Sequence, residues 1–159
     1  KHELVVQFPK GWNARVDTGN FVWVQYDPQG FTEGILVHYY PYQDESQISY
    51  ESLVSATDMW LKKRVPGPST GSYMSLEFDA PIYSKVFEKD KHYVREMKGL
   101  WTMQNDFMGG PFICWSFVDE ERSRIVSVFG FVFAPQFDKR NHIRKVESLL
   151  KTVTFPEPN

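Results

Sequence analysis

Cys114, the only cysteine of the chain, is a candidate nucleophile, because a thiol beside a histidine base forms the covalent intermediate of thiol hydrolases. His38 or His92 would supply the base in such a pair. However, Cys114 alternates with Phe112 and Ser116 in an apolar stretch, where a free cysteine usually behaves as a small buried hydrophobe. The pattern therefore favours a core residue, and the sequence identifies no catalytic residue.

Histidine spacing provides no metal-binding motif. No two histidines are four residues apart, the spacing that would place both rings on one helix face, and a single cysteine provides no thiolate set. A metal site would have to be assembled by folding from scattered residues. The sequence accordingly predicts neither a metal nor a cofactor. The histidines are His2, His38, His92 and His142.

The most distinctive stretch is a loop expected over residues 105–111. Its adjacent glycines permit positive φ and a close approach of the backbone to a partner, and Pro111 favours an extended residue before it. One interpretation is a ligand- or partner-binding loop, and the other is a tight connection in which Asn105 and Asp106 bond their own backbone. The candidate binding residues are Trp101, Asn105, Asp106, Phe107, Met108, Gly109 and Gly110.

Aromatic residues make up 16% of the chain, an excess that favours strands and a bulky core. Trp60 and Trp115 lie where the core pattern requires large side chains. Trp101 and Tyr42 lie beside loops, and are therefore the better candidates for an exposed surface that stacks against sugars or peptides.

Two hairpin-plus-helix units are expected to position these residues. Strands are predicted over 21–26 and 33–40, joined by the turn Asp27-Pro28-Gln29-Gly30, and a helix is predicted from Ser49 to Arg64. Strands over 112–118 and 124–133 and a helix over 138–152 repeat this order. Further strands are predicted over 4–8, 73–78, 82–87 and 93–103.

Because residues 124–133 are apolar on both sides of the strand, both faces of its sheet need a cover. We therefore expect an α+β fold in which an antiparallel sheet is sandwiched by two helices, with each helix folded over its own hairpin. The 159 residues suit one domain, residues 1–159.

Bulk charge argues against a nucleic-acid partner, since 18 Lys plus Arg face 20 Asp plus Glu, for a formal net charge of -2. No apolar run is long enough to span a membrane as a helix. The chain begins with Lys1 rather than Met, which suggests a trimmed or mature fragment.

The order of elements resembles the PsbP-like fold: Gly11-Trp12, the hairpin with Asp27-Pro28, a helix, and strand 124–133 leading into the last helix. Proteins of that fold are related to the extrinsic subunit of photosystem II and typically serve as binding or assembly factors. The resemblance implies an antiparallel sheet between helices.

A closer resemblance lies in residues 95–111 (REMKGLWTMQNDFMGGP), continuing through Phe112 and residues 129–133. This stretch is similar to a family of uncharacterised bacterial envelope lipoproteins, known chiefly from Bacteroidetes and classed as a domain of unknown function. The resemblance implies the C-terminal part of a longer protein in the bacterial cell envelope. Contact with the membrane would be made only through a lipid anchor outside this chain.

We therefore expect a monomeric, non-enzymatic interaction or ligand-binding domain of a cell-envelope lipoprotein, whose partner is an unidentified protein or small molecule. The alternative is a hydrolase or transferase with a site assembled from scattered Asp, His and Cys residues, and a third possibility is a structural spacer. An enzyme should present a deep pocket with converging titratable groups, and a binding domain an apolar or aromatic patch.

Overall fold

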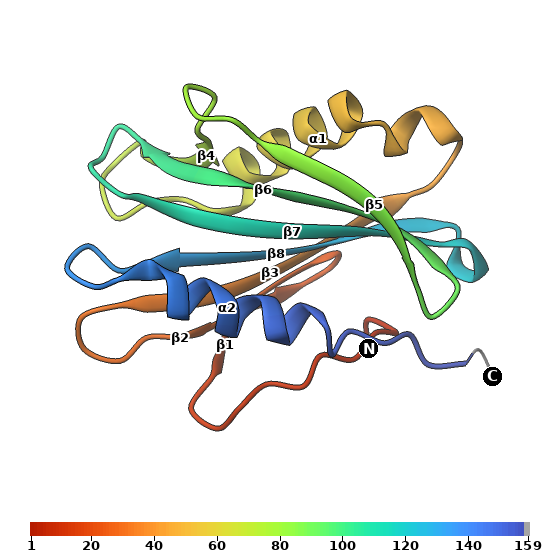
Figure 1. Ribbon diagram of the computed structural model, residues 1–159, viewed down its shortest axis with the longest axis horizontal. Coiled ribbons are helices and arrows are strands. Elements are labelled where there is room, and N and C mark those ends of the chain that lie inside the picture. Colours follow the sequence, from red (N-terminus) through yellow and green to blue (C-terminus); the bar gives the residue numbers. More distant parts are fainter. Residues whose placement is uncertain (158–159) are drawn as a thin grey trace.

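Residues 1–157 are described by the computed structural model, and their strands form one antiparallel sheet (Figure 1). The strand order is β1-β2-β3-β8-β7-β6-β4, and β5 pairs with β6 outside this path. The expected α+β class and antiparallel sheet are confirmed. The strands are β1 (Asn13–Thr18), β2 (Phe21–Tyr26), β3 (Thr32–Pro41), β4 (Tyr73–Leu76), β5 (Tyr83–Lys89), β6 (His92–Gln104), β7 (Gly109–Asp119) and β8 (Arg124–Phe133).

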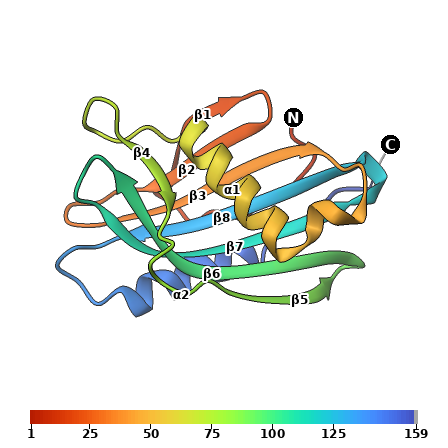
Figure 2. The same cartoon turned by 90° about the horizontal axis from the view of Figure 1, so that it is seen from above.

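Two α-helices lie on opposite faces of this sheet, α1 (Tyr50–Arg64) in front and α2 (Lys139–Leu150) behind in the view of Figure 2. Leu36 and Phe129 belong to the apolar cluster under α1, whereas Val37 and Val128 belong to the cluster under α2. The alternation follows from the period of two along a strand. Short 3₁₀ helices cover Glu45–Ile48 and Glu120–Arg122.

Local signals explain where the helices begin and end. Ser49 caps α1, its hydroxyl accepting a hydrogen bond from the Ser52 amide, and Asp138 caps α2 by accepting from the Arg140 amide. The α1 helix ends at Arg64, two residues before Pro66, and its last turn is basic, which suits the negative end of the helix dipole. Both helices thus match the sequence prediction closely.

The α2 helix packs on its own hairpin as expected, whereas α1 packs mainly on β4, outside its hairpin. The α2 helix lies over β7 and β8, and its Val146 side chain sits above Gly130 of β8. The α1 helix contacts β4 most extensively, and it also covers β2 through Trp60, whose ring lies 6.2 Å from that of Phe21. The two hairpin-plus-helix units therefore share the same order of elements, but their helices pack differently.

At the N-terminus one predicted strand is wrong and one strand was missed. Residues 4–8 form no regular strand, because only Val5 pairs, with Thr154 beyond α2. The first strand is instead β1, whose residues Asn13–Thr18 were not predicted. Its side chains are nearly all exposed at the edge of the sheet, so its sequence lacks the apolar alternation that marks a half-buried strand.

A buried carboxylate joins both ends of the chain to the sheet. Asp119 is fully buried and accepts hydrogen bonds from Arg124 at 2.9 Å and from Arg122 at 3.3 Å. Arg124 also donates to the carbonyls of His2 and Glu3, at 2.8 and 3.0 Å. Asp119 therefore fixes a guanidinium that in turn holds the N-terminal segment.

Replacing Asp119 with alanine should lower the free energy of unfolding by roughly 3–5 kcal/mol, because it leaves a buried arginine without its counter-charge. Urea unfolding of the purified chain measures the change. The control is Asp90→Asn, which removes an exposed carboxylate paired with Lys89 and should cost less than about 1 kcal/mol. Equal effects of the two substitutions would show that the cluster around Asp119 contributes nothing specific.

Candidate functional site

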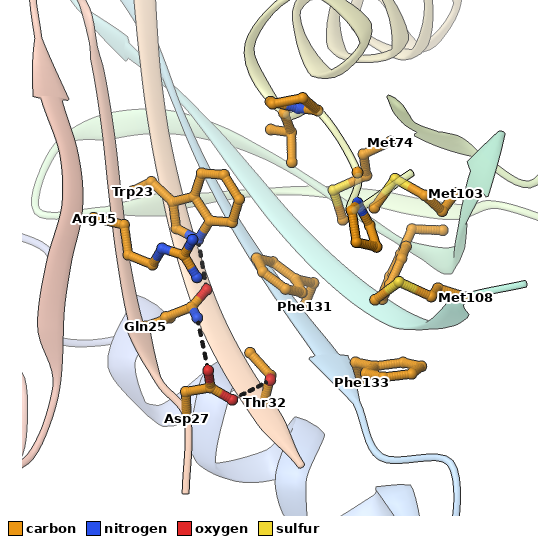
Figure 3. Close-up of a pocket in the computed structure, with 15 residues that line it drawn as sticks. Arg15, Trp23, Gln25, Asp27, Thr32, Met74, Met103, Met108, Phe131 and Phe133 are labelled. Atoms are coloured by element: carbon orange, nitrogen blue, oxygen red, sulfur yellow. Dashed lines mark hydrogen bonds between the residues drawn. The ribbon is translucent and has the colours of Figure 1, made fainter. Parts of the chain in front are cut away.

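A pocket of about 390 Å³ opens on the α1 side of the sheet, beyond the C-terminal end of that helix (Figure 3). It lies between β2, the segment 65–68 that follows α1, and the hairpin of β6 and β7. Most of its wall is apolar and is formed by Met74, Trp101, Met103, Met108, Phe131 and Phe133. We refer to it as the methionine pocket.

The apolar wall is rigid on one side and adaptable on the other. Trp101 is fixed because its indole N–H donates to the Val132 carbonyl at 3.1 Å, and its ring meets that of Phe131 edge to face at 5.7 Å. Beside Trp101 along β4 and β6 lie Met74 and Met103, which are direct cross-strand neighbours, and Met108 completes this side. Methionine is unbranched and polarisable, so this side can adjust to differently shaped ligands.

A glycine makes room for the aromatic floor. Phe131 lies over Gly34 of β3, and a Cβ atom at that position would stand only 2.3 Å from the ring. A larger residue at 34 would therefore push Phe131 toward the pocket. Gly34 pairs with Gln25 and with Phe131, which places the polar and aromatic sides of the pocket next to each other.

The polar wall is a chain of hydrogen bonds along β2. The Trp23 indole donates to Gln25 at 2.9 Å, and the Gln25 amide donates to Asp27 at 3.4 Å. The Thr32 hydroxyl donates to the other oxygen of Asp27 at 2.7 Å, and the Arg15 guanidinium lies 5.1 Å from the Trp23 ring centre. These contacts orient hydrogen-bonding groups at one end of an apolar hollow, the usual composition of a small-molecule site.

The structure divides the seven candidate binding residues into four groups, the last of which is the pair of glycines. Trp101 is buried, so the expectation that it lies on the surface is wrong, but with Met108 it lines the methionine pocket. Asn105 and Asp106 bond the facing loop, with Asn105 donating to the Gly71 carbonyl at 3.2 Å and Asp106 accepting from Ser69 at 2.8 Å. Phe107 is fully exposed at the hairpin tip.

The two glycines are not part of a loop. Gly109 and Gly110 begin β7, pairing with Thr102 and Trp101, and neither has a positive φ. Their small size is needed for packing, since a Cβ on Gly110 would stand 2.0 Å from the Val132 carbonyl oxygen. The glycines therefore allow other parts of this protein to pack closely against the start of β7.

Sequence reasoning missed the polar side of the pocket. Arg15, Trp23, Gln25, Asp27 and Thr32 come from β1, β2 and the start of β3. The one available signal was Gln25, an amide inside the otherwise apolar stretch 21–26, which the structure buries. Phe131 and Phe133 were expected only as core residues of the long strand.

Cys114 is fully buried, and this burial raises the pKa of its thiol to about 12. A thiol with such a pKa stays protonated at neutral pH and is a poor nucleophile. Burial, followed by the positive charges of Arg64 and Lys63, lowers the pKa of His38 to about 4. The environments of Cys114 and His38 therefore do not suit the roles of nucleophile and base that were considered for them in the sequence analysis.

In the part of the chain that the structure describes, no three His, Cys, Asp or Glu side chains are grouped as metal ligands. The same residues include no helix that is both long and apolar enough to cross a membrane.

Comparison with known families gives a clear assignment. Residues 1–152 match the family described as Domain of unknown function (DUF4837), and the chain belongs to that family. No curated protein matches the sequence.

Among solved structures, the chain is similar to the solution structure of cyanobacterial PsbP (CyanoP) from Synechocystis sp. PCC 6803. The similarity covers 98% of this chain and 88% of that chain, with a TM-score of 0.57 and 11% sequence identity. At this identity the likeness concerns the fold alone. It supports the fold resemblance inferred from element order.

His38 should make folding sensitive to mild acid. Its pKa of about 4 in the folded state lies below the ordinary value of 6.5, so the unfolded chain binds more protons between these values. Stability should therefore fall as the pH drops from about 6.5 toward 4, by no more than about 3 kcal/mol from this residue.

The variant His38→Phe keeps a flat ring against Trp60 but cannot be protonated. Urea unfolding of both proteins at about pH 7 and about pH 4.5 separates the His38 contribution from that of other groups, because only their difference reports it. The pH dependence should be shallower in the variant. Parallel pH profiles would contradict the assigned pKa shift.

Proposed function

We propose that this chain is a non-enzymatic binding domain that holds an apolar group in the methionine pocket. The observation that carries the proposal is the pocket itself: an apolar hollow with an adaptable methionine side, a fixed aromatic floor and a hydrogen-bonding end at Gln25 and Asp27. This composition suits a ligand with an apolar body and a polar head, or an apolar side chain of a protein partner.

The rim of the pocket offers a second contact for a protein partner. Phe107 projects from the hairpin that also carries Met108, and its side chain is completely exposed. Bonds from Asn105 and Asp106 to the facing loop hold the hairpin in place. An exposed aromatic residue on a fixed hairpin suits contact with a partner whose apolar group enters the pocket.

The proposal places this domain in a bacterial cell-envelope lipoprotein, attached to the membrane through a lipid anchor outside the chain and acting as a monomer. Support comes from the resemblance of residues 95–111 to envelope lipoproteins. We also propose that the fold is an α/β/α sandwich of the PsbP-like type, which the two helices on opposite faces and the similarity to CyanoP support. The protonated, buried thiol of Cys114 gives no support to the hydrolase or transferase alternative.

Filling the pocket should weaken binding of an apolar probe. The neutral fluorophore N-phenyl-1-naphthylamine, excited where tryptophan does not absorb, should brighten saturably with the wild-type chain. Met108→Trp places a larger side chain in the pocket and should weaken this binding at least about tenfold, equivalent to about 1.4 kcal/mol.

The matched control is Leu100→Trp, which adds the same ring at an exposed position of β6 outside the pocket. It should bind the probe as the wild type does, and thermal unfolding should show that both variants remain folded. Equal probe binding by the two variants would exclude the methionine pocket as the binding site.

A further inference from the structure

A second hollow, of about 340 Å³, lies on the same face of the sheet, beside the C-terminal half of α1. Its lining shares no residue with that of the methionine pocket. The side chains that matter are Asn20 and His38 from the sheet side, and Trp60, Lys63 and Arg64 from α1. We refer to it as the Trp60 hollow.

Buried nitrogen atoms without partners collect at this hollow. Within residues 1–157, four buried side-chain nitrogen or oxygen atoms make no hydrogen bond, and three of them belong to residues lining the Trp60 hollow. They are His38 Nδ1, Trp60 Nε1 and Arg64 Nε. Such groups are normally satisfied in folded proteins, so a ligand that offers acceptors here would gain hydrogen bonds that the protein itself does not supply.

The hydrogen-bonding capacity of these atoms determines which ligand groups they can bind. The indole of Trp60 and the guanidinium of Arg64 only donate hydrogen bonds, so both require an acceptor. Only 4% of Trp60 is exposed, so its indole N–H has little contact with bulk water. A carboxylate or phosphate group, which carries several acceptor oxygen atoms, has the capacity to accept from both donors.

The charges of the residues lining the hollow also favour a ligand that accepts hydrogen bonds. Lys63 and Arg64 are both cationic, and none of the residues lining the hollow is acidic. The partial negative charge at the C-terminal end of α1 opposes an anion, but it amounts to only about half a charge and faces three basic residues in the last turn. Arg64 is also held in place, since its Nη2 donates to the Asn20 side chain at 2.8 Å.

An aromatic floor limits what can enter. The rings of His38 and Trp60 stack with centres 4.9 Å apart and planes 7° apart, and Tyr40 tilts against His38 at 5.8 Å. The three partnerless nitrogen atoms are covered, so a ligand reaches them only when a side chain moves. Met59, which is 68% exposed and unbranched, lines the same hollow and can change its rotamer readily.

We infer that the Trp60 hollow binds an oxyanion, the carboxylate or phosphate group of a small ligand, through the N–H groups of Trp60 and Arg64 and the charge of Lys63. This inference goes beyond the binding proposed for the methionine pocket, because it concerns a different site and a different ligand chemistry. Either site can be present without the other.

Nuclear magnetic resonance of the tryptophan side chains provides the test. The chain has five tryptophans, so the indole N–H signals are few, and loss of one signal in Trp60→Phe assigns that of Trp60. Inorganic phosphate and acetate are titrated separately at constant ionic strength, with chloride as the reference ion. The Trp60 signal should shift saturably with one or both, and the anion that binds more tightly identifies the phosphate or carboxylate source.

Two charge-removing variants form a matched pair. Arg64→Gln removes a donor and a charge inside the hollow and should weaken anion binding at least about tenfold. Lys62→Gln removes the neighbouring charge outside the hollow, where Lys62 lies over the Tyr73 ring, and should leave binding within about twofold of the wild type.

The inference is overturned if the Trp60 signal does not move with either anion, or moves equally with chloride. It is also overturned if Arg64→Gln and Lys62→Gln weaken binding equally, since that result would indicate general attraction to a basic surface. Binding of the naphthylamine probe in the methionine pocket is independent of these outcomes, so failure of one proposal is distinguishable from failure of the other.

Discussion

The apolar character of both faces of β8 is the constraint on which the rest of the structure depends. Nine of its ten residues are buried, and the six of them with apolar side chains are divided between the cluster under α1 and the cluster under α2. Neither face can be left to water without a large hydrophobic cost. Hence the chain must provide cover on each side, and it does so with one helix following each of the two hairpins.

Both hollows arise because α1 covers its face incompletely. The helix ends at Arg64, and the chain then turns away through Pro66, Gly67 and Pro68 to reach β4. The Met74 amide donates to the Val65 carbonyl at 2.9 Å, which fixes this exit. The methionine pocket lies beyond the end of the helix, and the Trp60 hollow lies beside its last turns. A longer helix would fill part of the sheet face that the binding proposals use.

Strongly patterned elements could be predicted from the sequence, and weakly patterned ones could not. Both helices have capping residues and apolar stripes, and the strands of the two hairpins lie close to their expected positions. The edge strand β1 has no such pattern, because its exposed side chains need none. Residues 4–8 were predicted to form a strand because they are a short apolar run. Alternate residues of this run do pack against the cluster under α2, but only Val5 pairs with another segment of the chain.

The candidate site was only partly accessible to sequence reasoning, for a geometric reason. Trp101 and Met108 were selected for their proximity to a loop, and they do line a pocket. Their neighbours there, including Gln25 and Phe131, come from strands that meet only through the order of the sheet, which cannot be read from local pattern. The same limit applies to the Trp60 hollow, where His38 and Arg64 lie 26 residues apart in the sequence.

The arginine pair around Asp119 also has a mechanical consequence. Arg124 holds the carbonyls of His2 and Glu3, Arg122 holds that of Pro156, and the two ends of the chain lie at the same end of the molecule (Figure 1). Tension applied between the ends would load these hydrogen bonds, together with the backbone pair of Val5 and Thr154, before it reached the strands of the sheet. The hairpin bearing Phe107 lies at the far end of the sheet in the same view. The pocket beside this hairpin would therefore keep its shape under a force that had already detached the terminal segments.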